Sequence, residues 1–196
     1  MDYICQNLPM EQKLNRDFFV KHGLIFGGVG IVYALIAYLI GIEFMAGTAN
    51  SLINLTIIVG LMFFIGTTAR KMAGGFISFN NVFKAIFFSV FLGTILYILF
   101  NLLLFTLIDP ELFDRVWEYS MDKQVTQLED SGMSDDQIDD TLAMSETIRE
   151  YMLMRYSVWG FILEIIATSV FMAIPSLIVA AIVKKTPPPT IETLDS

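Results

Sequence analysis

The sequence predicts an all-α membrane protein with four transmembrane helices and an extramembrane helical hairpin between the third and fourth of them. Three observations predict this fold class. The mean hydropathy is +0.64 and only 16% of the residues are charged, whereas soluble domains contain about 25% charged residues. Several apolar runs are long enough to cross a bilayer. The acidic residues concentrate in one polar segment between two of these runs.

The acidity of the chain is a local feature. Segment 109–155 holds thirteen acidic and four basic residues, and the rest of the chain holds seven acidic and eight basic ones. We therefore expect the lipid bilayer, and not nucleic acid, to be a partner. The single cysteine, Cys5, excludes an intrachain disulfide, and the single histidine, His22, is interpreted as a residue of the membrane interface. No metal site and no cofactor are expected.

A polar N-terminal segment, 1–19, precedes the predicted membrane domain, 20–185. Met1 and Met10 remain alternative starts of the chain. The first span is expected over 22–42, where Gly23 and Gly27 form a GxxxG motif. Because glycine has no Cβ, two membrane helices approach closely at such a face. An intramolecular packing face is favoured over the seam of a dimer.

The second span is expected over 52–68, which is barely long enough to cross the bilayer upright. A turn with positive φ is expected at Gly74-Gly75. Ser78, Asn80 or Asn81 is expected to cap the next helix, with Asn80 as the first choice. That third span, 82–108, would be about 40 Å long, and the other spans are expected to pack beside it.

The acidic segment 109–155 predicts a helical hairpin with a cap at each helix end. Asp109 suits the N-cap of the first helix and Pro110 its first position. Apolar residues recur at three- and four-residue spacing along both helices. Gly132 is a natural C-terminal stop. Ser134, with Gln137 three residues later, predicts a capping box at the start of the second helix.

The fourth span is expected over 158–183, with a kink at Pro175. Nothing between Glu150 and Trp159 stops a helix, so this span is expected to continue the second hairpin helix. A short disordered tail, 186–196, begins at a run of prolines.

These features together resemble a known family. The basic pair Arg70-Lys71 is followed by Gly74-Gly75-Phe76-Ile77-Ser78-Phe79, then by Ile108-Asp109-Pro110-Glu111, by the acidic insertion, and by a last span that ends in Lys184-Lys185. The chain resembles, over about 18–185, the bacterial integral membrane family called domain of unknown function 4199, which is common in Bacteroidetes. The resemblance implies an inner-membrane location and assigns neither an activity nor site residues.

The basic residues predict the orientation. All eight bases outside the acidic segment fall on one predicted side of the membrane: Lys13, Arg16, Lys21, Arg70, Lys71, Lys84, Lys184 and Lys185. The positive-inside rule then puts both termini in the cytoplasm. The hairpin is expected in the periplasm.

Glu164 is the one acidic residue well inside a predicted span. At about 1.5 Å per residue it lies roughly 10 Å below the hairpin side, and Asn101 lies roughly 12 Å below the same side. We predict that the two form an intramembrane polar pair, with Tyr97 as a further neighbour. A proton or cation site, a structural link between helices, and a nearly hydrated carboxylate remain open readings of Glu164.

Three functions follow from these patterns. The first is a noncatalytic membrane module whose hairpin, 109–155, binds a periplasmic or membrane partner or organises a homo-oligomer. The second is a small proton- or cation-linked transporter or channel that uses Glu164, although the chain shows no internal repeat. An enzyme ranks last, because the spans offer no nucleophile, metal cluster or pair of acids at a catalytic spacing.

Overall fold

The computed structural model describes residues 14–154 and 158–186, and the regular elements in these ranges are helices. This confirms the all-α class. An isolated antiparallel bridge between Ile77 and Lys185 is the one β-type pairing there. The helices, in order, are α2 (Arg16–Ile40), α3 (Ile42–Met45), α4 (Thr48–Met72), α5 (Phe79–Leu103), the π-helix η2 (Leu104–Ile108), α6 (Leu112–Asp130), α7 (Asp135–Met154) and α8 (Val158–Val183).

Four of these helices are long and apolar enough to cross a membrane: Arg16–Ile40, Thr48–Met72, Phe79–Ile108 and Trp159–Val183. Each overlaps one of the four predicted spans, and the helix at the second of them extends beyond the expected 52–68 on both sides. The helix there has 25 residues, which corresponds to about 37 Å, so it is longer than a ~30 Å hydrocarbon core requires. Fully apolar composition marks the middle of a span, whereas Thr, Asn and basic residues extend its ends.

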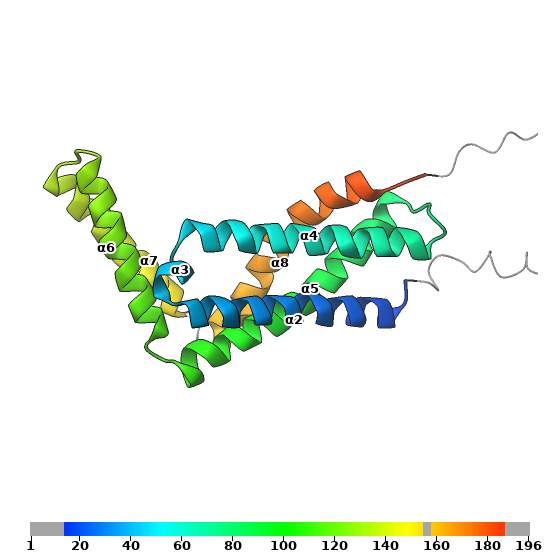
Figure 1. Ribbon diagram of the computed structural model, residues 1–196, viewed down its shortest axis with the longest axis horizontal. Coiled ribbons are helices and arrows are strands. Elements are labelled where there is room, and N and C mark those ends of the chain that lie inside the picture. The colour runs from blue at the N-terminus through cyan, green and yellow to red at the C-terminus, as the bar shows by residue number, and fades with distance from the viewer. Residues whose placement is uncertain (1–13, 155–157, 187–196) are drawn as a thin grey trace, which may run out of the picture.

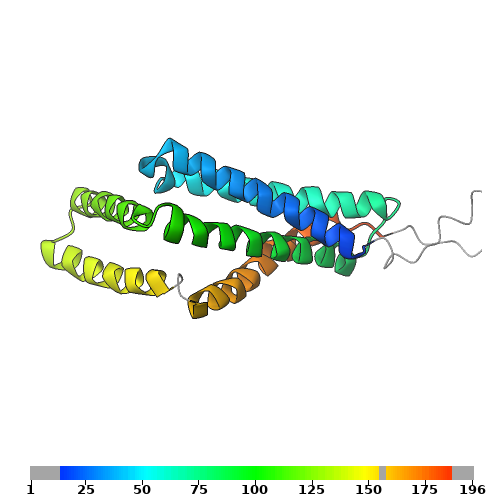
Figure 2. The ribbon, with the colours of Figure 1, turned by 90° about the horizontal axis from the view of Figure 1, so that it is seen from below.

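The third span is the centre of the bundle, as the sequence predicts. α5 contacts α2, α4 and α8, and α8 lies obliquely across it (Figures 1 and 2). The buried hydrophobic cluster includes Phe18 and Phe26 of α2 and Ile77. Its other residues lie where α4, α5 and α8 meet and are at most 3% exposed: Met62, Ile65, Ala69, Val82, Ala85, Ile86, Val90, Val179, Ala180 and Val183. In each helix these residues lie in the half nearest the described chain ends.

Both described chain ends lie at one end of the bundle, and α6 and α7 lie at the opposite end (Figure 1). Hydrogen bonds close the first of these ends. The backbone N–H of Ile77 donates to the carbonyl of Lys185 at 2.8 Å, and the reverse bond measures 3.0 Å. Arg70 donates to the carbonyl of Val183 at 3.3 Å. We call it the basic end, since α2, α4, α5 and α8 bring to it Arg16, Lys21, Arg70, Lys71, Lys84, Lys184 and Lys185.

The GxxxG residues of α2 lie against α5. A Cβ added at Gly23 would stand 2.9 Å from the Cβ of Leu92, and one at Gly27 would stand 2.7 Å from the carbonyl oxygen of Gly93. Gly93 completes the contact, because a Cβ there would stand 2.6 Å from the carbonyl oxygen of Gly23. These distances are too short for a methyl group, so the close approach of the two helices depends on glycine on both sides.

The turn between α4 and α5 also depends on glycine. Gly74 and Gly75 have φ of 79° and 92°, and their N–H groups donate to the carbonyls of Lys71 and Arg70 at 3.1 and 2.9 Å. This pattern is a Schellman motif. The first choice of cap, Asn80, was wrong, since α5 begins at Phe79 and the alternative Ser78 holds the N-cap position, without a side-chain hydrogen bond to the helix.

Several sequence-based expectations lie outside the described residues. They concern most of the polar segment 1–19, including Cys5 and the alternative start at Met10, and the tail 186–196 beyond residue 186. The expected continuity between the acidic segment and the fourth span falls on 155–157, which are also outside. Pro175 lies inside α8, which continues on both sides of it.

Candidate functional site

Glu164 lies on α8 at the meeting point of three hollows, of ≈ 250, 290 and 230 Å³. A charged side chain is expensive in a membrane span and usually faces the bundle interior or a cavity. Its position on three hollow walls follows that rule, and the side chain is partly buried.

All four candidate spans line the first of these, the central hollow of ≈ 250 Å³. Its polar lining residues come from three helices: Asn54 from α4, Thr94 and Tyr97 from α5, and Glu164 and Thr168 from α8. Phe26 and Gly30 of α2 close the remaining wall. Cavities between the helices of a bundle are a common location for ligand sites.

The second, the α5–α8 hollow of ≈ 290 Å³, contains both members of the predicted polar pair. Asn101 and Glu164 stand on its wall together with Tyr97, Phe105, Phe113 and Phe161. The amide nitrogen of Asn101 donates to the carbonyl of Tyr97 at 2.9 Å. Asn101 and Glu164, which residue counting put at a similar depth on two spans, therefore line one hollow. A direct hydrogen bond between them stays a prediction.

The third, the α7–α8 hollow of ≈ 230 Å³, lies where α7 approaches the start of α8. It is lined by Ile148, Tyr151, Met152, Met154, Gly160, Leu163, Glu164, Ala167 and Thr168. Tyr151 is 65% exposed and Leu163 is 54% exposed, so this hollow reaches the outer surface of the helices.

The π-helix η2 follows Asn101 directly and was not predicted. Its wider turn adds one residue to the helix between Leu104 and Ile108, and Phe105 from this turn lines the α5–α8 hollow. Single π-turns are frequent at functional sites. The hydroxyl of Thr106 donates to the carbonyl of Leu102 at 2.5 Å. Apolar residues are equally compatible with α- and π-turns, so the sequence carries no signal for this element.

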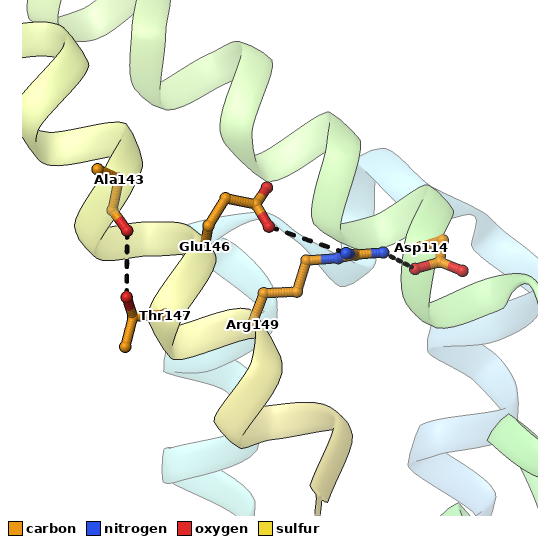
Figure 3. A network of polar contacts seen from close by, with 5 residues as sticks. All are labelled: Asp114, Ala143, Glu146, Thr147 and Arg149. Carbon is orange, nitrogen blue, oxygen red and sulfur yellow. Dashed lines mark hydrogen bonds and ion pairs between the residues drawn. The ribbon is translucent and has the colours of Figure 1, made fainter.

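α6 and α7 form the second candidate site, which we call the acidic helix pair. The guanidinium of Arg149 on α7 donates to Asp114 of α6 at 2.7 Å and lies 3.8 Å from Glu146 (Figure 3). The hydrogen bond that Arg149 donates to Asp114 raises the pKa of Arg149, so this side chain stays charged. The pair runs side by side in Figure 2. Leu112 and Ile138 are its buried apolar residues, at 1% and 7% exposed.

The turn between α6 and α7 has the caps that the sequence predicts. Gly132 has φ 79°. Its N–H donates to the carbonyl of Glu129 at 2.9 Å, and the N–H of Met133 donates to that of Leu128 at 3.3 Å, which is a Schellman motif. The side-chain oxygen of Gln137 accepts from the N–H of Ser134 at 3.3 Å, which is the returning half of a capping box.

The predicted cap at the start of α6 was wrong. α6 begins at Leu112, Glu111 holds the cap position, and no side chain bonds the helix start. The carboxylate of Asp109 instead accepts hydrogen bonds from Arg115 and, at 3.1 Å, from the hydroxyl of Tyr38 on α2. Pro110 lies in the turn before the helix. Asp109 thus joins α2 to α6, a role that depends on residues distant in the sequence.

Other polar residues around Glu164 were not singled out from the sequence. Asn54, Thr94 and Thr168 were ordinary span residues there, and the structure places them on the central hollow. Their polarity inside apolar spans was the available signal, but spacing alone does not show which helices face one another.

Among residues 14–154 and 158–186, no group of three His, Cys, Asp or Glu side chains is arranged to hold a metal ion.

Comparison with known proteins identifies the family of the chain. No curated protein and no solved structure matches the chain. A family model described as protein of unknown function (DUF4199) matches residues 21–185, which include all of the Glu164 hollows and the acidic helix pair. The chain therefore belongs to the DUF4199 family.

Proposed function

We propose that this protein is a noncatalytic, multi-pass protein of a bacterial inner membrane that engages a partner through its acidic helix pair. In this proposal the pair is an extramembrane hairpin in the periplasm, and both chain termini are cytoplasmic. The observation that carries it is the separation of charge along the bundle, since the basic end and the acidic helix pair lie at opposite ends (Figure 1).

The positive-inside rule supports this orientation. Short cytoplasmic segments next to spans carry an excess of Lys and Arg, and the basic end supplies such residues from all four spans. Two of them lie over aromatic rings: Lys184 is 6.0 Å from the ring centroid of Phe79, and Lys185 is 5.4 Å from that of Phe76. These cation–π contacts suit lysine side chains at the headgroup boundary, where the apolar stem packs on a ring and the ammonium group stays in the polar region.

The surface of the acidic helix pair supports a basic partner. Asp135, Asp136, Asp139 and Asp140 are all exposed on the first turns of α7. The caps on either side of Gly132 and the Arg149–Asp114 ion pair hold this surface on a defined scaffold. Concentrated charge of one sign steers a partner of opposite charge and makes association sensitive to salt.

Affinity capture in mild detergent tests the proposal. Full-length protein is compared with a variant that lacks 111–149 and with the fourfold variant D135N/D136N/D139N/D140N. A protein that is captured by the intact chain, lost with the deletion, and weakened by both the fourfold change and added salt supports the proposal. Capture of the same proteins by all three chains would contradict it. Recovery of a second copy of the chain would identify the partner as a homo-oligomer.

A second candidate is a small proton- or cation-linked transporter or channel, favoured by the position of Glu164 on three hollows. Intramembrane carboxylates mark ion and proton paths in many transporters. Proton and potassium flux into liposomes that carry the purified protein is the test. Flux that E164Q abolishes supports this function, and flux that E164Q leaves unchanged excludes the residue from the path.

A further inference from the structure

We propose that the basic end binds an anionic phospholipid, such as phosphatidylglycerol, at a site formed by Arg70, Lys184 and Lys185. We call these three residues the basic cluster. The inference goes beyond the partner binding proposed for the acidic helix pair, because it concerns the opposite end of the bundle and a different class of ligand. It shares with that function only the placement of the four apolar helices in a bilayer.

Contacts between segments distant in the sequence assemble the basic cluster. The guanidinium of Arg70, in the last turn of α4, donates to the carbonyl of Val183, the last residue of α8. Lys184 and Lys185 follow directly. The paired backbone hydrogen bonds between Lys185 and Ile77 fix the end of α8 against the connection between α4 and α5. The fold therefore brings a guanidinium and two ammonium groups together at one edge of the bundle.

The charges of the basic cluster have no carboxylate partner in residues 14–154 and 158–186. The ion pairs in this part of the chain join Arg115 and Arg149 to acidic residues at the opposite end. Of the acidic residues that the structure describes, Asp17 alone lies on a helix half at the basic end, and it is exposed on α2. Guanidinium and ammonium groups both bind phosphate oxygens strongly. A phosphate group can therefore neutralise the excess positive charge of this cluster.

The surface around the basic cluster is apolar, which favours a lipid over a soluble anion. Lys184 and Lys185 lie over the rings of Phe79 and Phe76, and these rings are 37% and 36% exposed. Ile182, in the last turn of α8, is 63% exposed. A molecule that matches this surface has a negative charge next to an apolar body. Anionic phospholipids have this composition, whereas acidic peptides and free phosphates lack the apolar part.

The depth of the basic cluster along the bundle also favours a lipid. Lys184 follows the last residue of the candidate span Trp159–Val183, and Arg70 lies near the end of Thr48–Met72. The side chains of the cluster thus start at the boundary of the apolar zone, which is the level of the lipid phosphates. Basic groups gathered between membrane helices at this level are a recurrent way to bind anionic headgroups.

The test titrates purified full-length protein, in dodecyl maltoside, with two lipids that differ only in the headgroup. They are dioleoylphosphatidylglycerol, which is anionic, and dioleoylphosphatidylcholine, which is zwitterionic. Native mass spectrometry measures the dissociation constant of the first bound lipid. We expect phosphatidylglycerol to bind about tenfold more tightly or better. Two soluble competitors, polyglutamate and glycerophosphoglycerol, which is the same headgroup without acyl chains, are expected to leave it bound.

Three variants assign the binding to the basic cluster. K184Q/K185Q is expected to weaken binding of phosphatidylglycerol about tenfold or more, since each base near an anionic lipid contributes roughly fivefold. K184R/K185R keeps both charges and is expected to bind within about twofold of wild type. R16Q/K21Q is the matched control, because it removes two exposed charges at the same end from α2, which packs mainly on α5. It is also expected to bind within about twofold of wild type.

The outcomes separate a lipid site from a general attraction of anions. Equal affinity of the wild-type chain for the two lipids, or equal losses in K184Q/K185Q and R16Q/K21Q, would overturn the proposal. Displacement of phosphatidylglycerol by either soluble competitor, at an equal concentration of charge, would assign the surface to soluble anions and would overturn it too. The comparison of lipids needs only the wild-type chain, so it decides even if a variant fails to fold, which circular dichroism and size-exclusion chromatography detect.

The same measurements distinguish this inference from the proposed function. A preference for phosphatidylglycerol in a chain that captures no protein through its acidic helix pair contradicts the proposed function alone. A captured partner in a chain that binds both lipids equally contradicts this inference alone.

Discussion

The two ends of the four-helix bundle are packed differently, although the same helices build both. At the basic end, Met62, Val82, Ala85 and Ile86 are 0% exposed. Nearer the acidic helix pair, the central hollow and the α5–α8 hollow lie between the same helices. Apolar composition alone therefore does not produce close packing, because α4, α5 and α8 are each apolar enough to cross a membrane.

Side-chain size along α5 explains the difference. Ala85, Ser89 and Gly93 let α2, α4 and α8 approach α5 closely. Beyond them, the larger side chains of Tyr97 and Phe105 line hollows. The change in side-chain size along α5 therefore separates a closely packed half of the bundle from a half that contains hollows.

The largest effect is expected when the same substitution is made at both ends. Ala85→Leu adds three carbon atoms to a fully buried position on α5 and should lower the free energy of unfolding by about 3 kcal/mol. Ala167→Leu adds them to the wall of the α7–α8 hollow and should change it by less than about 0.5 kcal/mol. SDS titration followed by circular dichroism measures both. Equal losses would show that the two ends are packed alike.

Glycine on α5 and α2 provides the next contrast. Gly93→Ala puts a methyl group 2.6 Å from the carbonyl of Gly23, and we expect a loss of about 2 kcal/mol in unfolding free energy. Gly28→Ala is the control, since a Cβ there meets nothing within 4 Å. The same SDS titration should leave this control unchanged or slightly more stable. A neutral Gly93→Ala would mean that α2 and α5 do not need their close approach.

Two buried serines at the basic end are expected to differ in their contribution to stability. The hydroxyl of Ser89 is buried with no hydrogen-bond partner among the described residues, whereas that of Ser176 donates to the carbonyl of Met172 at 2.7 Å. Because an unpaired buried hydroxyl is unfavourable, Ser89→Ala should raise stability by up to about 1 kcal/mol, and Ser176→Ala should lower it by about 1 kcal/mol. Thermal unfolding in one detergent gives both values, and a loss in both would refute the contrast.

The smallest effect is expected in the acidic helix pair. Arg149→Gln breaks the bond to Asp114, and exposed ion pairs contribute little to stability. We expect an unchanged unfolding midpoint but faster hydrogen exchange in α7, because the contact with α6 loosens. Lys123→Gln removes a basic charge from the exposed surface of α6 and should leave exchange in α7 as it was. Equal exchange in all three chains would mean that the ion pair does not order the helix pair.

The sequence predicted the features that depend on one helix at a time. Long apolar runs located the four spans, and the positions of Gly132 and Ser134 located the turn between α6 and α7. Depth counted along two helices brought Asn101 and Glu164 to one hollow. Each of these signals is local, since it comes from composition, spacing or backbone geometry within a few turns.

Features that depend on the relation between helices were missed or wrong. The spacing of Gly23 and Gly27 does not reveal that Gly93 of α5 is their counterpart. Asp109 has the composition of an N-cap, but Tyr38 and Arg115 compete for its carboxylate. The central hollow needs side chains from all four spans, and periodicity in a single sequence does not determine how four apolar helices rotate against one another.

The central claim is that the acidic helix pair and the chain termini lie on opposite sides of the membrane. In a Cys5→Ser background, single cysteines at Asp130 and at Thr186 are labelled in intact cells with a membrane-impermeant maleimide, after the outer membrane has been made permeable. With the acidic helix pair in the periplasm and the termini in the cytoplasm, we expect labelling of Asp130→Cys in intact cells and of Thr186→Cys only after the inner membrane is opened. Equal labelling of both in intact cells, or labelling of Thr186→Cys alone, would contradict it.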